Sequence, residues 1–280
     1  GFMGRAWFDL WVRLCVAPHP VFPARNQLNH LLTRNLVAEG IVEGLEAGVD
    51  GDGTIPEPWF EAPGFYFMNP HSLYGATDEV PMPPLTQRLD FELEACIIVK
   101  KDARNITAEQ APEYIAGYSI FNDWSARDIQ GREMQVGLGP NKGKDFANTI
   151  GPWITTSDEL DERREGDRLD LEMKVYINDK LIGQDNAKNL SWSFEEMLAY
   201  ASRGAIVGAG DVLGSGTCSQ GALAEFWSRT GKQEPAPLKP GDVVKLEIDL
   251  LGSLVNRIAE PNQPAEAVPA ARRTYGDDRL

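Results

Sequence analysis

Apolar and polar residues alternate over short segments in the middle of the chain, between residues 61 and 258. Successive side chains of a strand point to opposite faces, so this alternation predicts strands with one buried face. The segments with an alternating or fully apolar pattern are Leu89–Val99, Tyr118–Phe121, Leu169–Ile177, Leu181–Gln184, Asp211–Gly214 and Val243–Leu250. Asn178 and Asp179 lie between two of these segments and predict the turn of a β-hairpin.

Helix signals are fewer. Thr107 is followed three residues later by Gln110, which predicts a helix that runs to about Ala116. Ser193 and Glu196 form the pattern of a capping box before a helix over Phe194–Ser202. A further helix is expected around Gln27–Leu45. Strands thus outnumber helices, which predicts a β-rich, mixed α+β fold and argues against alternating βαβ units.

Composition divides the chain into three zones. Residues 1–60 are irregular and form an N-terminal segment, and residues 61–258 form the strand-rich domain. Residues 259–280 are rich in proline, alanine and charge, with few groups to bury, so we expect a mobile C-terminal tail.

The net charge limits the classes of molecule that the protein is expected to bind. The formal net charge of −15 would repel nucleic-acid phosphate, so DNA and RNA partners are not expected. An acidic substrate would need a local positive field, from a bound cation with Lys or Arg beside it. The three cysteines, Cys15, Cys96 and Cys218, are widely spaced and predict reduced thiols in a cytoplasmic protein. No apolar run approaches a membrane span, and Ala6–Val16 carries charges that argue against a signal peptide.

The first candidate site lies on the segment Leu89–Val99. On a continuous strand, Asp90, Glu92 and Glu94 share one face. Three carboxylates on one face repel one another unless a cation neutralises them, and Mg²⁺ prefers such oxygen ligands. The alternative is a solvated face of an edge strand, because Glu-x-Glu pairs are common there.

A second group of polar residues follows the predicted strand Tyr118–Phe121. Asp123 stands where a helix N-cap would lie, and Arg127 and Gln130 would then fall on the same side of the helix. A guanidinium can bind a substrate carboxylate through two hydrogen bonds. The alternative is a surface Asp–Arg pair on a helix, which is weaker here because the strand before it predicts burial.

Two loops add weaker signals. Lys144 is a single cation after a glycine- and proline-containing loop. The run Gly214–Thr217 ends a predicted strand and offers N–H groups and hydroxyls that could cradle a carboxylate. Taken alone, each of these two patterns occurs more often in an ordinary turn than in a binding site.

In combination, these features resemble the fumarylacetoacetate hydrolase family over roughly Phe65–Ile258. The motifs that carry the resemblance occur in the family's order: Asp-x-Glu-x-Glu at 90–94, Asn-Asp-x-Ser-Ala-Arg-Asp-x-Gln at 122–130, Gly-Lys-x-Phe at 143–146 and Gly-x-Gly-Thr at 214–217. The resemblance implies a mixed β-sandwich roll of the family's C-terminal type, usually a homodimer, with a divalent metal in a cleft and residues 1–60 as a lid.

The resemblance also implies roles for individual residues. The metal ligands would be Glu92, Glu94 and Asp123, with Mg²⁺ as the expected ion and Mn²⁺ and Ca²⁺ also suited to oxygen ligands. The residues implied to face the substrate are Tyr66, Arg127, Gln130, Lys144 and Thr217. Arg127, Gln130 and Lys144 would also act in catalysis.

The implied catalytic base is a histidine near the N-terminus. His30 lies in the matching region, and Glu225 resembles the glutamate that orients this histidine in the family's hydrolytic founder. Glu39 is a second carboxylate that could hold it. His71 is the alternative base, and a third interpretation is that neither histidine acts.

The resemblance implies an enzyme that hydrolyses a C–C bond in a small β-diketo or 2-oxo carboxylic acid, such as an acylpyruvate or a fumarylacetoacetate-like compound. Decarboxylation, isomerisation or dehydration of a 2-oxo acid such as oxaloacetate would use the same metal without an attacking histidine-activated water. A degenerate, non-catalytic metal-binding dimer is the remaining alternative.

Overall fold

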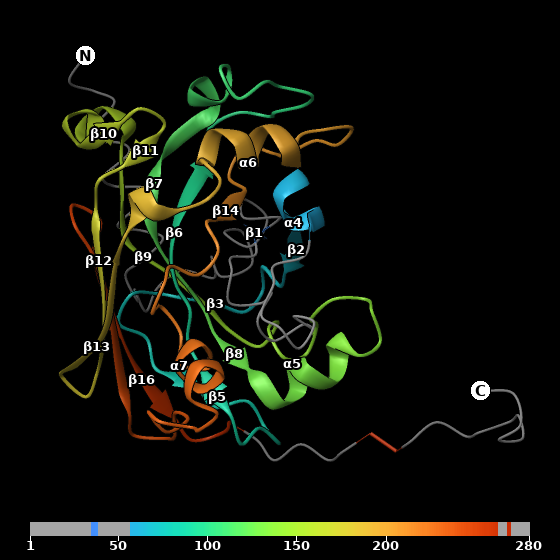
Figure 1. Cartoon of the computed structure of the whole chain (residues 1–280), viewed down its shortest axis with the longest axis vertical. Coiled ribbons are helices and arrows are strands. Elements are labelled where there is room, and N and C mark those ends of the chain that lie inside the picture. The colour runs from blue at the N-terminus through green and yellow to red at the C-terminus, as the bar shows by residue number, and fades with distance from the viewer. Residues whose placement is uncertain (1–34, 39–56, 263–267, 270–280) are drawn as a thin grey trace, which may run out of the picture.

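The computed structural model describes residues 35–38, 57–262 and 268–269. Two large sheets, packed on one another, organise these residues, and the helices lie at the ends of the sheets (Figure 1). The α+β, β-rich class predicted from the sequence is therefore confirmed.

The larger sheet is mixed and has seven strands in the order β2-β1-β14-β6-β7-β9-β3. Its strands are β1 (Asn35–Ala38), β2 (Phe65–Met68), β3 (Leu73–Tyr74), β6 (Leu93–Val99), β7 (Ile115–Asp123), β9 (Asn148–Thr155) and β14 (Val212–Gly214). Strands β1 and β14 pair in parallel, as do β3 and β9, and the other pairs are antiparallel.

The second sheet has five strands in the order β13-β12-β15-β16-β4. These are β4 (Val80–Pro81), β12 (Glu172–Ile177), β13 (Lys180–Asn186), β15 (Val243–Ile248) and β16 (Gly252–Ala259). Two small ribbons pair β5 (Leu89–Asp90) with β8 (Ser125–Ala126) and β10 (Arg164–Glu165) with β11 (Arg168–Leu169).

The helices are short. The α-helices are α4 (Glu57–Glu61), α5 (Arg127–Met134), α6 (Phe194–Ala201) and α7 (Leu223–Thr230), and the 3₁₀ helices are η1 (Ala111–Tyr114), η2 (Ser157–Arg163) and η3 (Ala187–Asn189). In Figure 1, α6 lies at the upper end of the sheets, and α5 and α7 lie at the lower end. None of the helices within the described ranges is long and apolar enough to cross a membrane.

The hydrophobic core fills the space between the two sheets. Alternate residues of β6 and β7, such as Ile97 and Ile120, pack there with Val175 of β12 and Leu246 of β15. The other face of β6 carries Glu94, Cys96 and Ile98, and the last two pack in a second, smaller cluster. Strand alternation thus separates the sandwich core from the face that carries the acidic residues.

Several predicted elements agree with the structure. The hairpin β12–β13 turns at Asn178 and Asp179, whose φ angles of 50° and 65° are the left-handed values that tight hairpin turns require. The capping box of Ser193 and Glu196 forms, with both hydrogen bonds present, at the start of α6. Cys96 and Cys218 are free, buried thiols, as predicted, and Cys15 lies outside the described residues.

Other predicted helices and strands differ from the structure in length or in type. The helix expected over Gln27–Leu45 is replaced at Asn35–Ala38 by β1, which pairs between β2 and β14, and the rest of that range lies outside the described residues. Gln110 does accept the Thr107 N–H at 3.0 Å, but the helix is only η1, because β7 begins at Ile115. The strand at Tyr118–Phe121 extends over all of β7.

The capping box gives a test of local stability. Replacement of Ser193 by Ala removes the hydroxyl that accepts the Glu196 N–H at 3.1 Å, and we expect it to lower the free energy of unfolding by about 1 kcal/mol. Urea denaturation measures this change. Ser191→Ala is the matched control, because Ser191 is exposed and its recorded contact with Arg168 uses the backbone carbonyl. Equal stability of Ser193→Ala and the wild type would contradict the role of the cap.

Candidate metal centre

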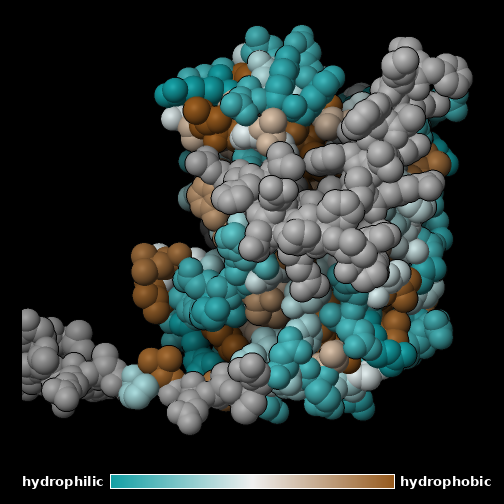
Figure 2. All heavy atoms as spheres, turned by 180° about the vertical axis from the view of Figure 1, so that it is seen from behind, coloured by the Kyte–Doolittle hydropathy of each residue, from teal (hydrophilic) through white to brown (hydrophobic). Residues whose placement is uncertain are grey.

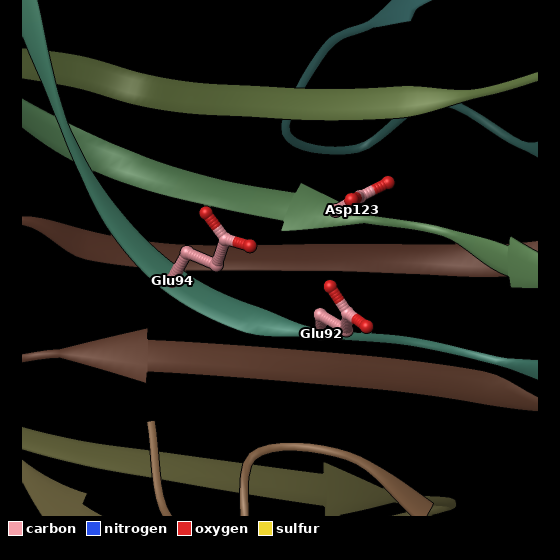
Figure 3. Close-up of side chains that lie close together, drawn as sticks. All are labelled: Glu92, Glu94 and Asp123. Atoms are coloured by element: carbon pink, nitrogen blue, oxygen red, sulfur yellow. The ribbon is translucent and has the colours of Figure 1, made fainter. Parts of the chain in front are cut away.

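Three carboxyl groups meet on the acidic face of the larger sheet. Glu92, Glu94 and Asp123 each place an oxygen within 4.8 Å of the others, and all three are buried (Figure 3). Register explains the meeting: Leu93 of β6 pairs with Asn122 of β7, so Asp123 lies beside Glu92 at the end of β7. We call these three residues the carboxylate cluster.

Asp90 does not join the carboxylate cluster, so the prediction of three acids on one face of one strand was wrong for this residue. The strand breaks between β5 and β6, where Phe91 N–H bonds to the side chain of Asp90 at 2.7 Å and Glu92 N–H bonds to the Asn122 side chain at 3.0 Å. Because the chain leaves the regular pleat there, the two-residue alternation does not carry across the break.

The Asp90 carboxylate instead holds two distant elements together. It accepts hydrogen bonds from Leu223 N–H (2.8 Å) and Ala224 N–H (2.9 Å), the first two residues of α7, and from Arg127 Nε (2.9 Å). A carboxylate at a helix N-terminus satisfies N–H groups that the helix itself leaves unbonded. No local pattern indicates this role, because its partners are 133 and 134 positions away along the chain.

Arg127 and Gln130 lie in the first turn of α5. The Arg127 guanidinium contacts Asp90, Glu92 (2.7 Å) and the side-chain oxygen of Gln130 (3.0 Å), and its side chain is fully buried. Asp123 ends β7 and Ala126 precedes α5, so the expected N-cap role of Asp123 was wrong. The structure does bring Arg127, Gln130 and the carboxylate cluster together.

Lys144 and Tyr66 contact the cluster from two further segments. The Lys144 ammonium lies 2.8 Å from Glu92 Oε1 and 3.0 Å from Asp123 Oδ2, and it is 5.7 Å from the centre of the Tyr66 ring. The Tyr66 hydroxyl donates a hydrogen bond to Asp123 Oδ2. Two residues that the sequence placed at the substrate therefore lie directly beside the acidic groups.

The charges of this region do not balance among the residues that the structure describes. Four carboxyl groups, of Asp90 and the carboxylate cluster, face the two basic side chains of Arg127 and Lys144. Full ionisation would leave two excess negative charges in a buried volume, where repulsion is only weakly screened. A divalent cation would neutralise this excess.

The pKa values follow from this imbalance. Burial would raise the pKa of Glu92, but Lys144 and Arg127 beside it lower the value to about 2. Burial raises the pKa of Asp123 to about 7, against the attraction of Lys144. Burial and the charges of Asp123 and Glu92 raise the pKa of Glu94 well above its ordinary value. Without a cation, Asp123 and Glu94 therefore hold protons under conditions in which exposed carboxyls have lost them.

The oxygens fit a hard cation. Glu94 Oε2 accepts the Gly216 N–H at 3.2 Å, whereas Glu94 Oε1 and Asp123 Oδ1 are buried with no hydrogen-bond partner within the described ranges. Buried carboxylate oxygens without a donor are costly, and Mg²⁺, Mn²⁺ and Ca²⁺ bind such oxygens. The carboxylate cluster thus has the ligand type and the open coordination positions that a divalent metal needs.

The glycine-rich loop after β14 lies beside Glu94. Gly216 has φ of +77°, which favours glycine, and it directs its N–H to the Glu94 carboxylate. Thr217 is buried, and its methyl group would lie 3.0 Å from a Cβ placed on Gly221. The loop thus contacts the cluster through the Gly216 N–H. Contact of Thr217 with a substrate remains a prediction.

The sequence predicted a histidine as the catalytic base and Glu225 as the carboxylate that orients it. Glu225 lies in α7, where its carboxylate accepts hydrogen bonds from Ser219 Oγ (3.3 Å), the Gln220 N–H and the Arg229 guanidinium. His30 and Glu39 lie outside the described residues. His71 is exposed, and its backbone N–H donates to the Asn69 side-chain oxygen at 3.0 Å. A histidine base oriented by Glu225 therefore remains a prediction.

Comparison with protein families gives a match over residues 40–259 to the model described as "Fumarylacetoacetate (FAA) hydrolase C-terminal". The chain is 36% identical to the fumarylacetoacetase fahA of Aspergillus fumigatus over 59% of this chain and 46% of that protein. It is 30% identical to the maleylpyruvate hydrolase of Aquipseudomonas alcaligenes over 68% of this chain and 58% of that protein.

The human mitochondrial oxaloacetate tautomerase FAHD2A is 29% identical over 91% of this chain and 77% of that protein. The chain thus spans about half to three quarters of the length of these three relatives.

Solved structures show the same fold. The fumarylacetoacetate hydrolase of Exiguobacterium antarcticum superposes with a TM-score of 0.60 and 26% identity, over 81% of this chain and 75% of that chain. The fumarylpyruvate hydrolase of Pseudomonas aeruginosa, crystallised with Mn²⁺ and pyruvate, superposes with a TM-score of 0.63 and 23% identity, over 81% of this chain and 89% of that chain.

The raised pKa values give a test of cation binding. Asp123 holds a proton below about pH 7 in the cation-free protein, and the pKa of Glu94 is raised well above its ordinary value, so bound Mn²⁺ must displace protons from these groups. We therefore expect affinity for Mn²⁺ to rise as pH increases from about 5.5 to 7.5, with protons released on binding. Calorimetry in two buffers that differ in ionisation enthalpy measures the number released.

Asp123→Asn is the informative variant for this test. It removes one anionic ligand and one displaceable proton, so it should weaken Mn²⁺ binding and release fewer protons. Affinity that does not change with pH, together with no proton release near pH 6, would contradict the assignment of these pKa shifts.

Proposed function

Because the chain belongs to the fumarylacetoacetate hydrolase family, we propose that it is a divalent-metal-dependent hydrolase that cleaves a C–C bond in a small β-diketo or 2-oxo carboxylic acid. One observation carries the proposal: three buried carboxyl groups converge beside Lys144 and Arg127, with two oxygens that lack a donor within the described residues. Such a site can bind a dication and an anionic substrate together.

The relatives support the substrate class. They include a maleylpyruvate hydrolase and a fumarylacetoacetase, and a structural neighbour was crystallised with Mn²⁺ and pyruvate. The acids in these names carry an oxo group near a carboxylate, which is the arrangement that a hard cation chelates. We propose Mg²⁺ as the physiological ion, with Mn²⁺ or Ca²⁺ able to take its place.

A divalent cation held by the carboxylate cluster would act as a Lewis acid and polarise the oxo group of the substrate. The chain's own residues would complete the site. Lys144 directs an ammonium into the cluster and would stabilise negative charge that develops on a substrate oxygen. Gln130 would donate a hydrogen bond to the same charge, and Arg127, held by Asp90 and Glu92, supplies a fixed positive field behind it.

Tyr66 and Thr217 would orient the substrate. The Tyr66 hydroxyl bonds to Asp123, so its ring and its hydroxyl lie where a bound acid would meet the cluster. Thr217, after the loop that bonds Glu94 through Gly216, would meet the substrate carboxylate. For hydrolysis, His30 would activate water as a general base, oriented by Glu225 or Glu39, with His71 as the alternative base.

Oxaloacetate tautomerisation is a second candidate function. The human oxaloacetate tautomerase matches over 91% of this chain, which is more than the 59% and 68% matched by the fumarylacetoacetase and the maleylpyruvate hydrolase. Keto–enol exchange needs the cation and the basic side chains but no attacking water. Decarboxylation of the same acid would use the same groups, so the histidine distinguishes these reactions from hydrolysis.

The direct test is a panel of fumarylacetoacetate, acylpyruvates and oxaloacetate, assayed with Mg²⁺ or Mn²⁺ and with EDTA. We expect cleavage of at least one diketo acid by the wild type and its loss with EDTA. Asp123→Ala should lower kcat/KM about a hundredfold or more, because Lewis-acid stabilisation is worth several kcal/mol and about 1.4 kcal/mol corresponds to a tenfold change in rate. Keto–enol exchange of oxaloacetate without diketo-acid cleavage would favour the tautomerase.

Asp167→Ala is the control for this variant, because the exposed Asp167 carboxylate pairs with its neighbour Arg168 at the surface. It should retain the wild-type rate. Full activity of Asp123→Ala, or wild-type activity that EDTA does not reduce, would refute the metal-dependent mechanism.

A further inference from the structure

We propose that Glu133 is a positioning residue that holds the Lys144 ammonium in the carboxylate cluster. The inference rests on the proposed function, in which Lys144 stabilises charge on the substrate. Glu133 lies in the last turn of α5, one residue before the helix ends at Met134, and no motif of the sequence indicated a role for it.

The Glu133 carboxylate binds three successive backbone N–H groups of the segment that leads into Lys144. It accepts from Asn141 N–H (2.8 Å) and Gly143 N–H (3.0 Å) through Oε2, and from Lys142 N–H (2.7 Å) through Oε1. Hydrogen bonds to a charged acceptor are about twice as strong as those between neutral groups. Three converging N–H groups also form an anion-binding concavity of the kind that backbone segments provide.

The same segment is clamped against the first turn of α5. The Gly143 carbonyl accepts the Ala126 N–H at 2.8 Å. A Cβ added to Gly143 would lie 2.7 Å from the Gln130 backbone nitrogen, so the two backbones touch. Residues 141–143 are therefore held between the first and last turns of one helix, and Lys144 extends from this anchored segment to Glu92 and Asp123.

The tip of the loop between α5 and Lys144 offers little packing to hold it, whereas Pro140, which follows the tip, is buried. Val136 and Leu138 are 69% and 80% exposed, and Gly137 and Gly139 have positive φ angles of 74° and 79°. Figure 2 shows hydrophobic atoms that stand out from the molecular surface on the side where Figure 1 places the loop after α5. The polar anchor at Glu133, and not burial of the loop tip, thus sets the path of the chain.

The anchor at Glu133 fixes the position of the Lys144 Nζ. Removal of the Glu133 carboxylate leaves residues 141–143 without their shared acceptor, while the contacts of Arg127 with Asp90 and Glu92 remain. A displacement of about 1 Å in a catalytic group can lower a rate about a hundredfold. Glu133 should therefore affect turnover mainly through Lys144.

A double-mutant cycle of Glu133→Ala and Lys144→Met in the full chain tests this. We expect Glu133→Ala to lower kcat about 10- to 100-fold with KM changed less than about threefold. In the Lys144→Met background, the same substitution should cost less than about twofold, because the group that it positions is gone. A general structural role would produce the same loss in both backgrounds and would overturn the proposal.

Lys142→Ala is the matched control. Lys142 lies in the same segment, and its ammonium pairs with Asp145 at 2.9 Å, but the variant keeps the backbone N–H that Glu133 binds. It should retain the wild-type kcat. A loss as large as that of Glu133→Ala would mean that any change in this segment disturbs the site, which would overturn the specific role of Glu133.

Hydrogen exchange measured on the same variants needs no substrate. Glu133→Ala should speed exchange of the amide protons at residues 141–145 about tenfold or more, since three hydrogen bonds that hold the segment closed are lost. Unchanged exchange would overturn the proposal. If the wild type turns over none of the acids, the proposed function fails separately, and exchange alone decides whether Glu133 anchors the segment.

Discussion

The structure depends on one electrostatic constraint, which is that four carboxyl groups are buried beside two basic side chains, with no further basic side chain in an ion pair with them among the described residues. Asp90 is paired with Arg127 and with the start of α7, and Glu92 lies between Arg127 and Lys144. Glu94 and Asp123 share what positive charge remains, and burial raises the pKa of both. A buried charge without a partner is expensive, so this arrangement is at its most stable with protons or a cation in place.

The surrounding fold supplies the rigidity that such an arrangement needs. Strands β6 and β7 lie in the middle of the larger sheet, with the sandwich core on one side of them and the acidic side chains on the other. Asp90 connects the break between β5 and β6 to α5 and α7, and Glu133 connects the end of α5 to Lys144. The polar groups that contact the cluster are thus themselves fixed by further hydrogen bonds, which keeps the geometry precise.

In the proposed function, the same cluster would serve more than one reaction of a 2-oxo acid. A cation and the basic groups beside it stabilise negative charge on an oxo group whichever bond changes next. Hydrolysis also requires a base that activates water, whereas tautomerisation does not. The family contains both kinds of enzyme among the relatives of this chain, so residues outside the carboxylate cluster must distinguish them.

By itself, the sequence determined what depends on neighbours within a few residues. The hairpin at Asn178-Asp179, the capping box of Ser193 and Glu196 and the β-rich class follow from local periodicity and turn chemistry, and the ordered motifs identified the family. Tertiary structure decided where these pieces meet. The break after Asp90, the insertion of β1 into the sheet and the three N–H groups gathered by Glu133 depend on pairings or loop paths that no local period encodes. The physical reason is that alternation specifies a face within one strand, whereas register between distant strands and the burial of charge are settled only when the whole chain packs.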